Sequence, residues 1–517
     1  MNSIAFQPPI AFEAPIPSGF IPAMPIESPT SRARAGQPVW AATPIQARLA
    51  ILRRARHLLA ENAEELAGKI SRSRGRPIIE VLTAELLPLL DAFRFLERRA
   101  KKILAPRRLG ASGRPLWLSR VESEIRREPM GIVLLIAPSN YSLFLSGVQA
   151  IQALAAGNAV LLKPGDNGSV AAHALKHALE KAGLDERLFG VLSESPEAAQ
   201  AAIEAGVDKV VLTGSAETGV QILRQLAPHL TPATMELSGC DAVFLRADAD
   251  LDLVVKALRF GLQLNGGATC IAPRRVFVPH SLAAELESKL AEAFQSFPPI
   301  KISPELNRRL LPLLIEALSQ GARLVAGQIQ PGGQIIAPVI LAEVGSELRL
   351  FWEDIFAPVL SLMVVNDEPQ ALAFSAHSPY ALGATIFSRD ANAARELAAR
   401  LRAGIVLIND LIVPTVDPRL PFGGRGRSGF GSTRGAEGLL EMTAVKVVSR
   451  RRGSWRPHFD PPVAEDAKIF SNYITTAHGS GWRSRAIALG QLLRWLACRG
   501  VKQVSISPNK HSAKDLV

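Results

Sequence analysis

Three widely separated residues of this chain have side chains that together suit covalent chemistry on a carbonyl group. Cys270 ends the glycine-rich segment Asn265–Cys270, Glu236 precedes that segment, and Asn140 lies far upstream. A thiol can attack the carbonyl carbon, a carboxylate can take a proton from water, and an amide N–H can hold the oxyanion that forms. A lone cysteine beside glycines is more often a small buried apolar residue, so the rest of the chain decides whether Cys270 reacts.

The composition is that of a folded protein with several domains. The chain has 517 residues, of which 48% are hydrophobic and 21% charged. This length predicts about two or three domains. Three cysteines cannot form a disulfide framework, so we expect a reducing, cytoplasmic compartment. No apolar run is long enough to span a membrane as a helix, and residues 1–35 are predicted to form a mobile arm and not a secretory signal.

The net charge of +12 is concentrated at the C-terminus, where 12 Lys and Arg face 4 Asp and Glu between Arg450 and Val517. A general nucleic-acid binder carries its basic surface on the folded body. In this chain, the positive and negative charges of the residues before Arg450 nearly cancel. The sequence also lacks the cysteine and histidine spacing of a zinc site. We therefore predict no nucleic-acid partner and no metal.

The periodicity of apolar residues predicts the elements that position these side chains. A helical region covers 40–103, with Thr43 as a cap and a break at Gly75. Short apolar runs then alternate with helices. The expected strands are 131–137, 159–163, 189–192, 209–213 and 233–237, with helices at 143–155, 169–182, 196–205 and 216–226. Such alternation predicts a parallel, doubly wound sheet that binds nucleotides at the carboxyl ends of its strands.

The turn Gly214–Gly219 lies between the fourth strand and its helix, where backbone N–H groups and a helix dipole could receive a phosphate. Taken alone, it is more simply interpreted as an ordinary glycine-rich turn between a strand and a helix. A second alternating unit covers 251–409, and the glycine-dense loop Pro421–Gly431 follows it. Two further strand-like segments, Leu116–Ile125 and Ala444–Val448, lie outside both units.

Taken in order, seven segments resemble the motifs of the NAD(P)-dependent aldehyde dehydrogenase superfamily. They are Ala137–Tyr141, Ala153–Pro164, Leu212–Ser215, Glu236–Gly239, Gly267–Cys270, Glu353–Pro358 and Pro421–Gly424. The resemblance implies an aldehyde dehydrogenase-like α/β fold with two doubly wound domains and a small β oligomerisation element. The implied parts are a Rossmann-like cofactor domain at 36–235 with an oligomerisation hairpin at 110–128, a catalytic domain at 236–415, a return segment with an oligomerisation strand at 416–450, and a basic extension at 451–517. It also implies a homodimer or homotetramer.

The resemblance implies a role for each candidate residue. Cys270 would attack the aldehyde, and the Asn140 amide with the Cys270 N–H would hold the oxyanion. Hydride transfer to the nicotinamide would leave a thioester, which water activated by Glu236 would hydrolyse to a carboxylic acid. The implied cofactor residues are Lys163 and Asp166 at the adenosine ribose, Gly214 and Ser215 at the pyrophosphate, and Asp354 and Phe356 at the nicotinamide.

Several residues depart from the family motifs. Asp166 and Asp354 are each one methylene shorter than the usual glutamate. Because an anionic Asp166 would repel a 2′-phosphate, we predict NAD as the cofactor in preference to NADP. The other departures are Ser139, Ser238, Cys240, Ala268 and Ala357.

The sequence thus predicts oxidation of an aldehyde to a carboxylic acid. A coenzyme A-acylating relative is one alternative, but a thiol would then resolve the thioester and Glu236 would not be needed. A non-catalytic scaffold is the other alternative, and the joint presence of Cys270, Glu236 and Asn140 argues against it.

The C-terminal segment Trp482–Arg499 predicts a basic amphipathic helix. Its apolar face is flanked by arginines and includes Trp482, Leu489 and Leu493. Docking on the body or on a neighbouring subunit is the simpler interpretation. The alternative is peripheral contact with an anionic membrane, which would fit a hydrophobic aldehyde delivered from lipid.

Overall fold

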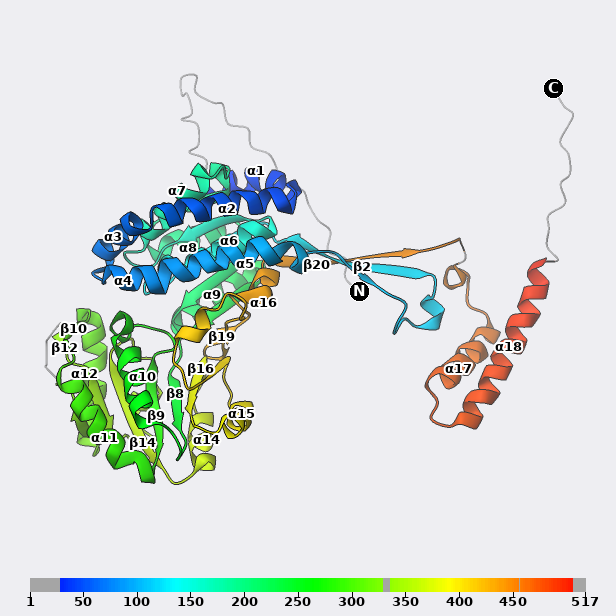
Figure 1. Ribbon diagram of the computed structural model, residues 1–517. Coiled ribbons are helices and arrows are strands. Elements are labelled where there is room, and N and C mark those ends of the chain that lie inside the picture. Colours follow the sequence, from blue (N-terminus) through cyan, green and yellow to red (C-terminus); the bar gives the residue numbers. More distant parts are fainter. Residues whose placement is uncertain (1–27, 329–334, 455, 505–517) are drawn as a thin grey trace, which may run out of the picture. The chain divides into compact units, whose positions relative to one another are not determined.

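A computed structural model describes residues 28–328, 335–454 and 456–504 (Figure 1). The described residues divide into two compact units. One is formed from 1–109 with 124–448, and the other from 110–123 with 449–517, each in its described part. Both α/β sheets belong to the first unit, so the boundary placed between residues 235 and 236 remains a prediction.

The first sheet confirms the predicted doubly wound arrangement. Its strand order is β19-β7-β6-β3-β4-β5, and all neighbours are parallel except β19, which returns from late in the chain to run antiparallel to β7. The strands are β3 (Ile132–Ile136), β4 (Ala159–Lys163), β5 (Phe189–Val191), β6 (Lys209–Gly214), β7 (Ala233–Leu237) and β19 (Gly429–Phe430), and the connecting helices are α6 (Phe144–Ala156), α7 (Ser169–Lys181), α8 (Pro196–Glu204) and α9 (Ala216–Leu226).

The helices before this sheet begin earlier than predicted. Residues 29–35 were expected in a mobile arm, but they belong to α1 (Pro29–Ala42), which buries Ala33 and Trp40 against the sheet domain. Thr43 follows that helix and bonds back to Val39, so it does not cap the next one. The remaining helices are α2 (Ile45–Glu61), α3 (Ala63–Arg74), α4 (Ile78–Val81), a π-helical turn (Leu82–Leu86) and α5 (Leu87–Ile103). Residues 1–27 of the predicted arm lie outside the described residues.

The second sheet has seven strands in the order β11-β13-β14-β9-β8-β16-β17. Sequence analysis missed β8, which follows β7 after only three residues, so no intervening helix marked it. The strands are β8 (Asp241–Leu245), β9 (Pro273–Pro279), β11 (Arg323–Ala326), β13 (Val339–Ala342), β14 (Val359–Val365), β16 (Gly383–Phe387) and β17 (Ile405–Ile408), and the helices include α10 (Leu251–Gln263), α11 (His280–Gln295), α12 (Pro304–Ser319), α14 (Glu368–Ala376) and α15 (Ala391–Arg400).

A three-stranded sheet joins β1 (Arg107–Leu109), β2 (Val121–Pro129) and β20 (Thr443–Arg451). The predicted strand Leu116–Ile125 was wrong in its first half, because Leu116–Leu118 forms a 3₁₀ turn and β2 starts at Val121.

The second unit contains the helices α17 (Ala464–His478) and α18 (Trp482–Val504), which pack together. None of the helices in the described part of the chain is long and apolar enough to cross a membrane.

Candidate active site

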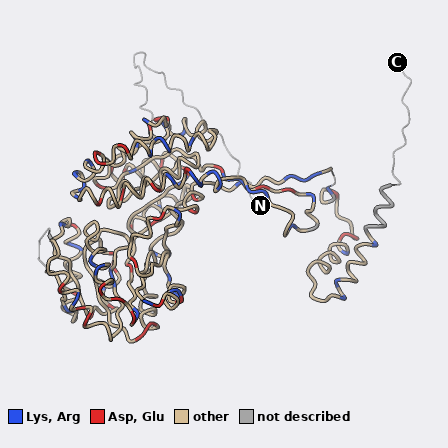
Figure 2. The backbone as a smooth tube through the Cα atoms, in the orientation of Figure 1, with Lys and Arg blue, Asp and Glu red and all other residues tan. Residues whose placement is uncertain are grey.

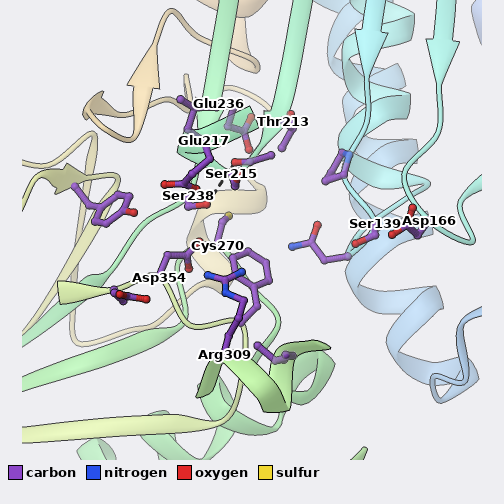
Figure 3. A pocket seen from close by; sticks show the side chains of 18 of the residues that line it. Ser139, Asp166, Thr213, Ser215, Glu217, Glu236, Ser238, Cys270, Arg309 and Asp354 are labelled. Atoms are coloured by element: carbon purple, nitrogen blue, oxygen red, sulfur yellow. Dashed lines mark hydrogen bonds between the residues drawn. The ribbon is translucent and has the colours of Figure 1, made fainter. Parts of the chain in front are cut away.

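A cleft of about 690 Å³ collects nearly all the predicted site residues. Figure 3 shows Asp166 and Ser139 on one side of the view, with Cys270, Asp354 and Glu236 across from them. Lys163 is the one predicted residue that does not line the cleft. The predicted residues that do line it are Asn140, Asp166, Gly214, Ser215, Glu236, Cys270, Asp354 and Phe356.

The loop that carries Cys270 is held in an unusual backbone conformation. Asn265, Gly266 and Gly267 all have positive φ, at 51°, 62° and 73°. A Cβ on Gly267 would lie 2.9 Å from the backbone nitrogen of Pro358, so only glycine lets this loop pack on the segment that follows Phe356.

A buried arginine ties these two segments together. Arg274 donates hydrogen bonds of 2.7 Å to the carbonyl oxygen of Ala357 and 2.6 Å to that of Gly267. Its side chain is 5% exposed. The nucleophile loop and the predicted nicotinamide loop are therefore fixed relative to each other.

The amide of Asn140 points toward the loop of Cys270. Its Nδ2 donates a 3.1 Å hydrogen bond to the carbonyl oxygen of Ala268, and its Oδ1 accepts one from the Tyr141 N–H. The bond to Ala268 uses one of the two amide hydrogens. The second hydrogen leaves this side chain suited to an oxyanion formed at Cys270.

Glu236 lies at the carboxyl end of β7 and is only 2% exposed. The hydroxyl of Thr433 donates a hydrogen bond to its Oε2. Thr433 reaches this position because β19 pairs with β7, with Gly429 opposite Glu236. Gly429 has φ of 93°, and a Cβ there would meet the Met235 carbonyl oxygen at 1.9 Å, so the return of the chain requires glycine.

Burial controls the protonation of the site. It raises the pKa of the Glu236 carboxyl, which nearby Arg434 opposes. Burial also raises the pKa of the Cys270 thiol well above its usual range, and the negative charge of Glu236 adds to this. Cys270 is therefore a thiol at neutral pH in this state, and forming the thiolate requires a proton acceptor.

The cleft also has donors and acceptors that fit a nicotinamide nucleotide. Ser215 caps α9 by accepting a 3.1 Å hydrogen bond from the Thr218 N–H, and the N-terminus of this helix lies at the cleft, which Gly214 and Ser215 line. Among the described residues, Asp354 Oδ1 is a buried oxygen without a partner. Such an orphaned acceptor suits a ribose hydroxyl.

Lys163 ends β4 and is half-buried beside the cleft. Burial lowers the pKa of its amine, and Asp166 opposes that shift. Sequence analysis also missed residues that line the cleft. Arg427, from the glycine-dense loop, forms an ion pair with Glu217 and lies 5.9 Å over the Tyr380 ring, and Arg309 comes from α12, where no motif marked it.

Residues 22–448 match the model of the aldehyde dehydrogenase family. The chain belongs to this family. As an aldehyde dehydrogenase it oxidises an aldehyde to a carboxylic acid with NAD or NADP, through a thiohemiacetal and a thioester on cysteine.

Relatives of this aldehyde dehydrogenase use either cofactor. A Mycobacterium tuberculosis aldehyde dehydrogenase complexed with NAD+ has a TM-score of 0.76 and 27% identity, over 83% of this chain and 90% of that one. The NADP-dependent glyceraldehyde-3-phosphate dehydrogenase of Bacillus halodurans C-125 has a TM-score of 0.76 and 28% identity, over 82% and 90%. The 4,4′-diapolycopene aldehyde oxidase of a Methylomonas species is 29% identical over 465 residues, which are 88% of this chain and 87% of that protein.

Proposed function

We propose that Cys270, Glu236 and Asn140 carry the aldehyde oxidation. The Cys270 sulfur bonds to the aldehyde carbon, and the Asn140 amide with the Cys270 N–H holds the oxyanion. After the carbon is oxidised, the thioester on Cys270 is attacked by water, and Glu236 takes the proton from that water as the sulfur leaves. The convergence of the three side chains on one cleft carries this assignment.

The same cleft supports the cofactor assignments. Ser215 and Gly214 would hold the pyrophosphate, Asp354 and Phe356 the nicotinamide ribose and ring, and Lys163 with Asp166 the adenosine ribose. When bound, the nucleotide supplies the hydride acceptor. We propose NAD as the preferred cofactor, because the exposed Asp166 carboxylate would repel a 2′-phosphate.

The cofactor preference is tested by kcat/KM with each nucleotide. The wild-type protein should have a higher kcat/KM with NAD than with NADP. Asp166→Ser should raise kcat/KM with NADP and so bring the two values closer together. Equal kcat/KM values for the wild-type protein would show that the Asp166 side chain does not approach the 2′ position.

We propose a long, apolar aldehyde as the substrate and a cytoplasmic location with peripheral membrane contact. The Methylomonas relative is named a 4,4′-diapolycopene aldehyde oxidase, and this name supports the proposed substrate class. The low cysteine content favours the reducing cytoplasm. NADH formation should be measured across straight-chain aldehydes of increasing length. The expected result is a kcat/KM that rises with chain length, and a preference for short or charged aldehydes would refute it.

The second unit supports the membrane contact. Helix α18 packs on α17 through Ala488, which is 3% exposed, so part of it is docked. Apolar side chains of both helices remain exposed. Along the described part of α18, basic residues occur without acidic ones (Figure 2). The exposed apolar residues are Phe470, Ile474, Trp482, Ile487, Leu489 and Leu493. Exposed apolar and basic groups together suit the surface of an anionic bilayer.

Sedimentation of the full chain with vesicles tests this contact. The protein should bind phosphatidylserine-containing vesicles and leave phosphatidylcholine vesicles unbound, and Ile487→Glu with Leu493→Glu should abolish the binding. Leu230→Ser is the matched control, because Leu230 is an exposed leucine of the first unit. Vesicle binding that survives the double variant would place the contact elsewhere.

We propose that the three-stranded sheet joins copies of the chain into a homodimer or homotetramer. Val445 and Val447 of β20 are 58% and 60% exposed, and an open strand of this kind favours pairing. Light scattering at micromolar concentration should give two or four copies. A monomer would contradict the proposal.

A further inference from the structure

Arg434 is a buried cation that the family motifs did not indicate. Its side chain is 5% exposed and belongs to the segment that returns to β7. The guanidinium lies 3.9 Å over the ring of Phe422 and 5.4 Å from that of Phe144. One nitrogen, Nη1, donates a 2.8 Å hydrogen bond to the Thr415 carbonyl oxygen. Within the described residues, its Nε has no partner.

A buried anion, Glu236, interacts electrostatically with this cation. Thr433, the residue before Arg434, donates its hydroxyl to Oε2 of Glu236, while Oε1 of Glu236 has no partner among the described residues. One neutral hydroxyl is a weak substitute for the water that a carboxylate loses on burial, which costs several kcal/mol. The guanidinium of Arg434 is thus placed to balance a charge that the hydrogen bonds leave uncompensated.

Electrostatic interactions connect Arg434 to both proposed reactive groups. It lowers the pKa of Glu236 and that of Cys270, against the effect of burial on each. Glu236, Asp241 and Asp354 raise the pKa of the Cys270 thiol, while the buried Arg274 is a second cation that interacts with Cys270. Arg434 therefore opposes a set of anions that would keep the thiol protonated.

We propose that Arg434 is a positioning residue that acts as a fixed counter-cation of the active site, favouring the carboxylate form of Glu236 and easing the loss of the Cys270 proton. This inference rests on the proposed roles of Cys270 and Glu236. The guanidinium acts through these two groups and not on the substrate. It sets how much thiolate is present for the attack and how much carboxylate is present to activate water.

The test is the rate at which iodoacetamide alkylates Cys270 at pH 8 in the enzyme without cofactor or substrate. Arg434→Met keeps much of the apolar stem and removes the charge. It should slow alkylation by up to about tenfold, because loss of the opposing cation raises the pKa of the thiol further and lowers the fraction present as thiolate. Glu236→Gln removes the opposing anion and should speed alkylation. Arg434→Lys should restore most of the rate.

A matched control separates charge from packing. Arg48 is also a buried arginine whose Nη1 bonds only carbonyl oxygens and whose Nε lacks a partner in the described structure, but it lies in α2. Arg48→Met should leave the alkylation rate at the wild-type value. If Arg434→Met fails to fold, the comparison uses Arg434→Gln, which keeps a donor for Thr415, against Arg434→Lys.

Failure of the proposed role of Arg434 and failure of the proposed function give different results. Wild-type alkylation of Cys270 in the folded Met or Gln variant would overturn the role of Arg434 and leave the role of Cys270 intact. Aldehyde oxidation that survives Cys270→Ser would instead overturn the proposed function. A purely structural role for Arg434 would lower stability in Met, Gln and Lys variants alike, without the separation by charge.

Discussion

Arg76 donates a 3.0 Å hydrogen bond to the main-chain carbonyl oxygen of Asn140, the residue we assign to the oxyanion. The same nitrogen donates a 2.8 Å bond to Glu85, which is fully buried and also accepts from the Leu143 N–H at 2.7 Å. Glu85 lies in the π-helical turn between α4 and α5, a distortion often found at functional sites. A buried ion pair thus supports the loop of Asn140 from behind.

Glu85→Gln should destabilise the protein and slow the first half-reaction. Removing this charge leaves the buried Arg76 with only the longer contact to Glu80, and breaking a buried ion pair costs up to about 3–5 kcal/mol of unfolding free energy. A shifted Asn140 should slow the NADH burst by up to about 10²-fold. The control is Glu97→Gln, because Glu97 is 8% exposed, pairs with Arg56 at 2.7 Å and does not line the cleft. A destabilised Glu85→Gln protein with a normal burst rate would limit the pair to a structural role.

Cys270→Ser should abolish aldehyde oxidation while leaving the fold and nucleotide binding unchanged. A serine hydroxyl loses its proton far less readily than a thiol, and the buried site makes an anion harder still to form. Steady-state NADH formation and circular dichroism check the two parts. Oxidation at the wild-type rate would sink the assignment of the nucleophile.

Glu236→Gln should slow thioester hydrolysis much more than thioester formation. The loss of a general base costs about 10²–10⁴-fold, so a full NADH burst should precede a very slow steady state. In the wild-type protein, burial raises the pKa of Glu236, so the steady-state rate should increase with pH as the carboxylate forms. An unchanged steady-state rate would refute the role, and strong acceleration by coenzyme A would favour a different acyl acceptor.

Ionisation of the Asp354 carboxyl should make nucleotide binding depend on pH. Burial raises the pKa of its carboxyl to about 6. Above that pH the ionised oxygens accept hydrogen bonds from ribose hydroxyls, and below it protonation weakens them. Affinity for NAD, measured by fluorescence titration, should therefore tighten as pH rises through about 6, and Asp354→Asn should flatten the curve. The same dependence in Asp354→Asn would mean that another group titrates.

The sequence by itself determined the sheet architecture and the family. Apolar strands such as 132–136 and 159–163 alternate with helices, and few arrangements other than a parallel, doubly wound sheet can bury them. The motif residues lie at the ends of these strands, where a parallel sheet brings them together. Local patterns failed at β8, because this strand follows β7 directly and no helix separates the two apolar runs. They also failed in α1, where packing against the sheet domain orders a segment that the sequence predicted to be mobile.

Only the tertiary structure decided what surrounds the reactive groups. The contact of Thr433 with Glu236 joins residues 197 positions apart, and it depends on Gly429 letting β19 approach β7. The partners of Arg434 and of the pair Arg76–Glu85 likewise come from distant segments. Periodicity reports which face of an element is buried, but the sign and distance of the charges that meet there depend on long-range packing.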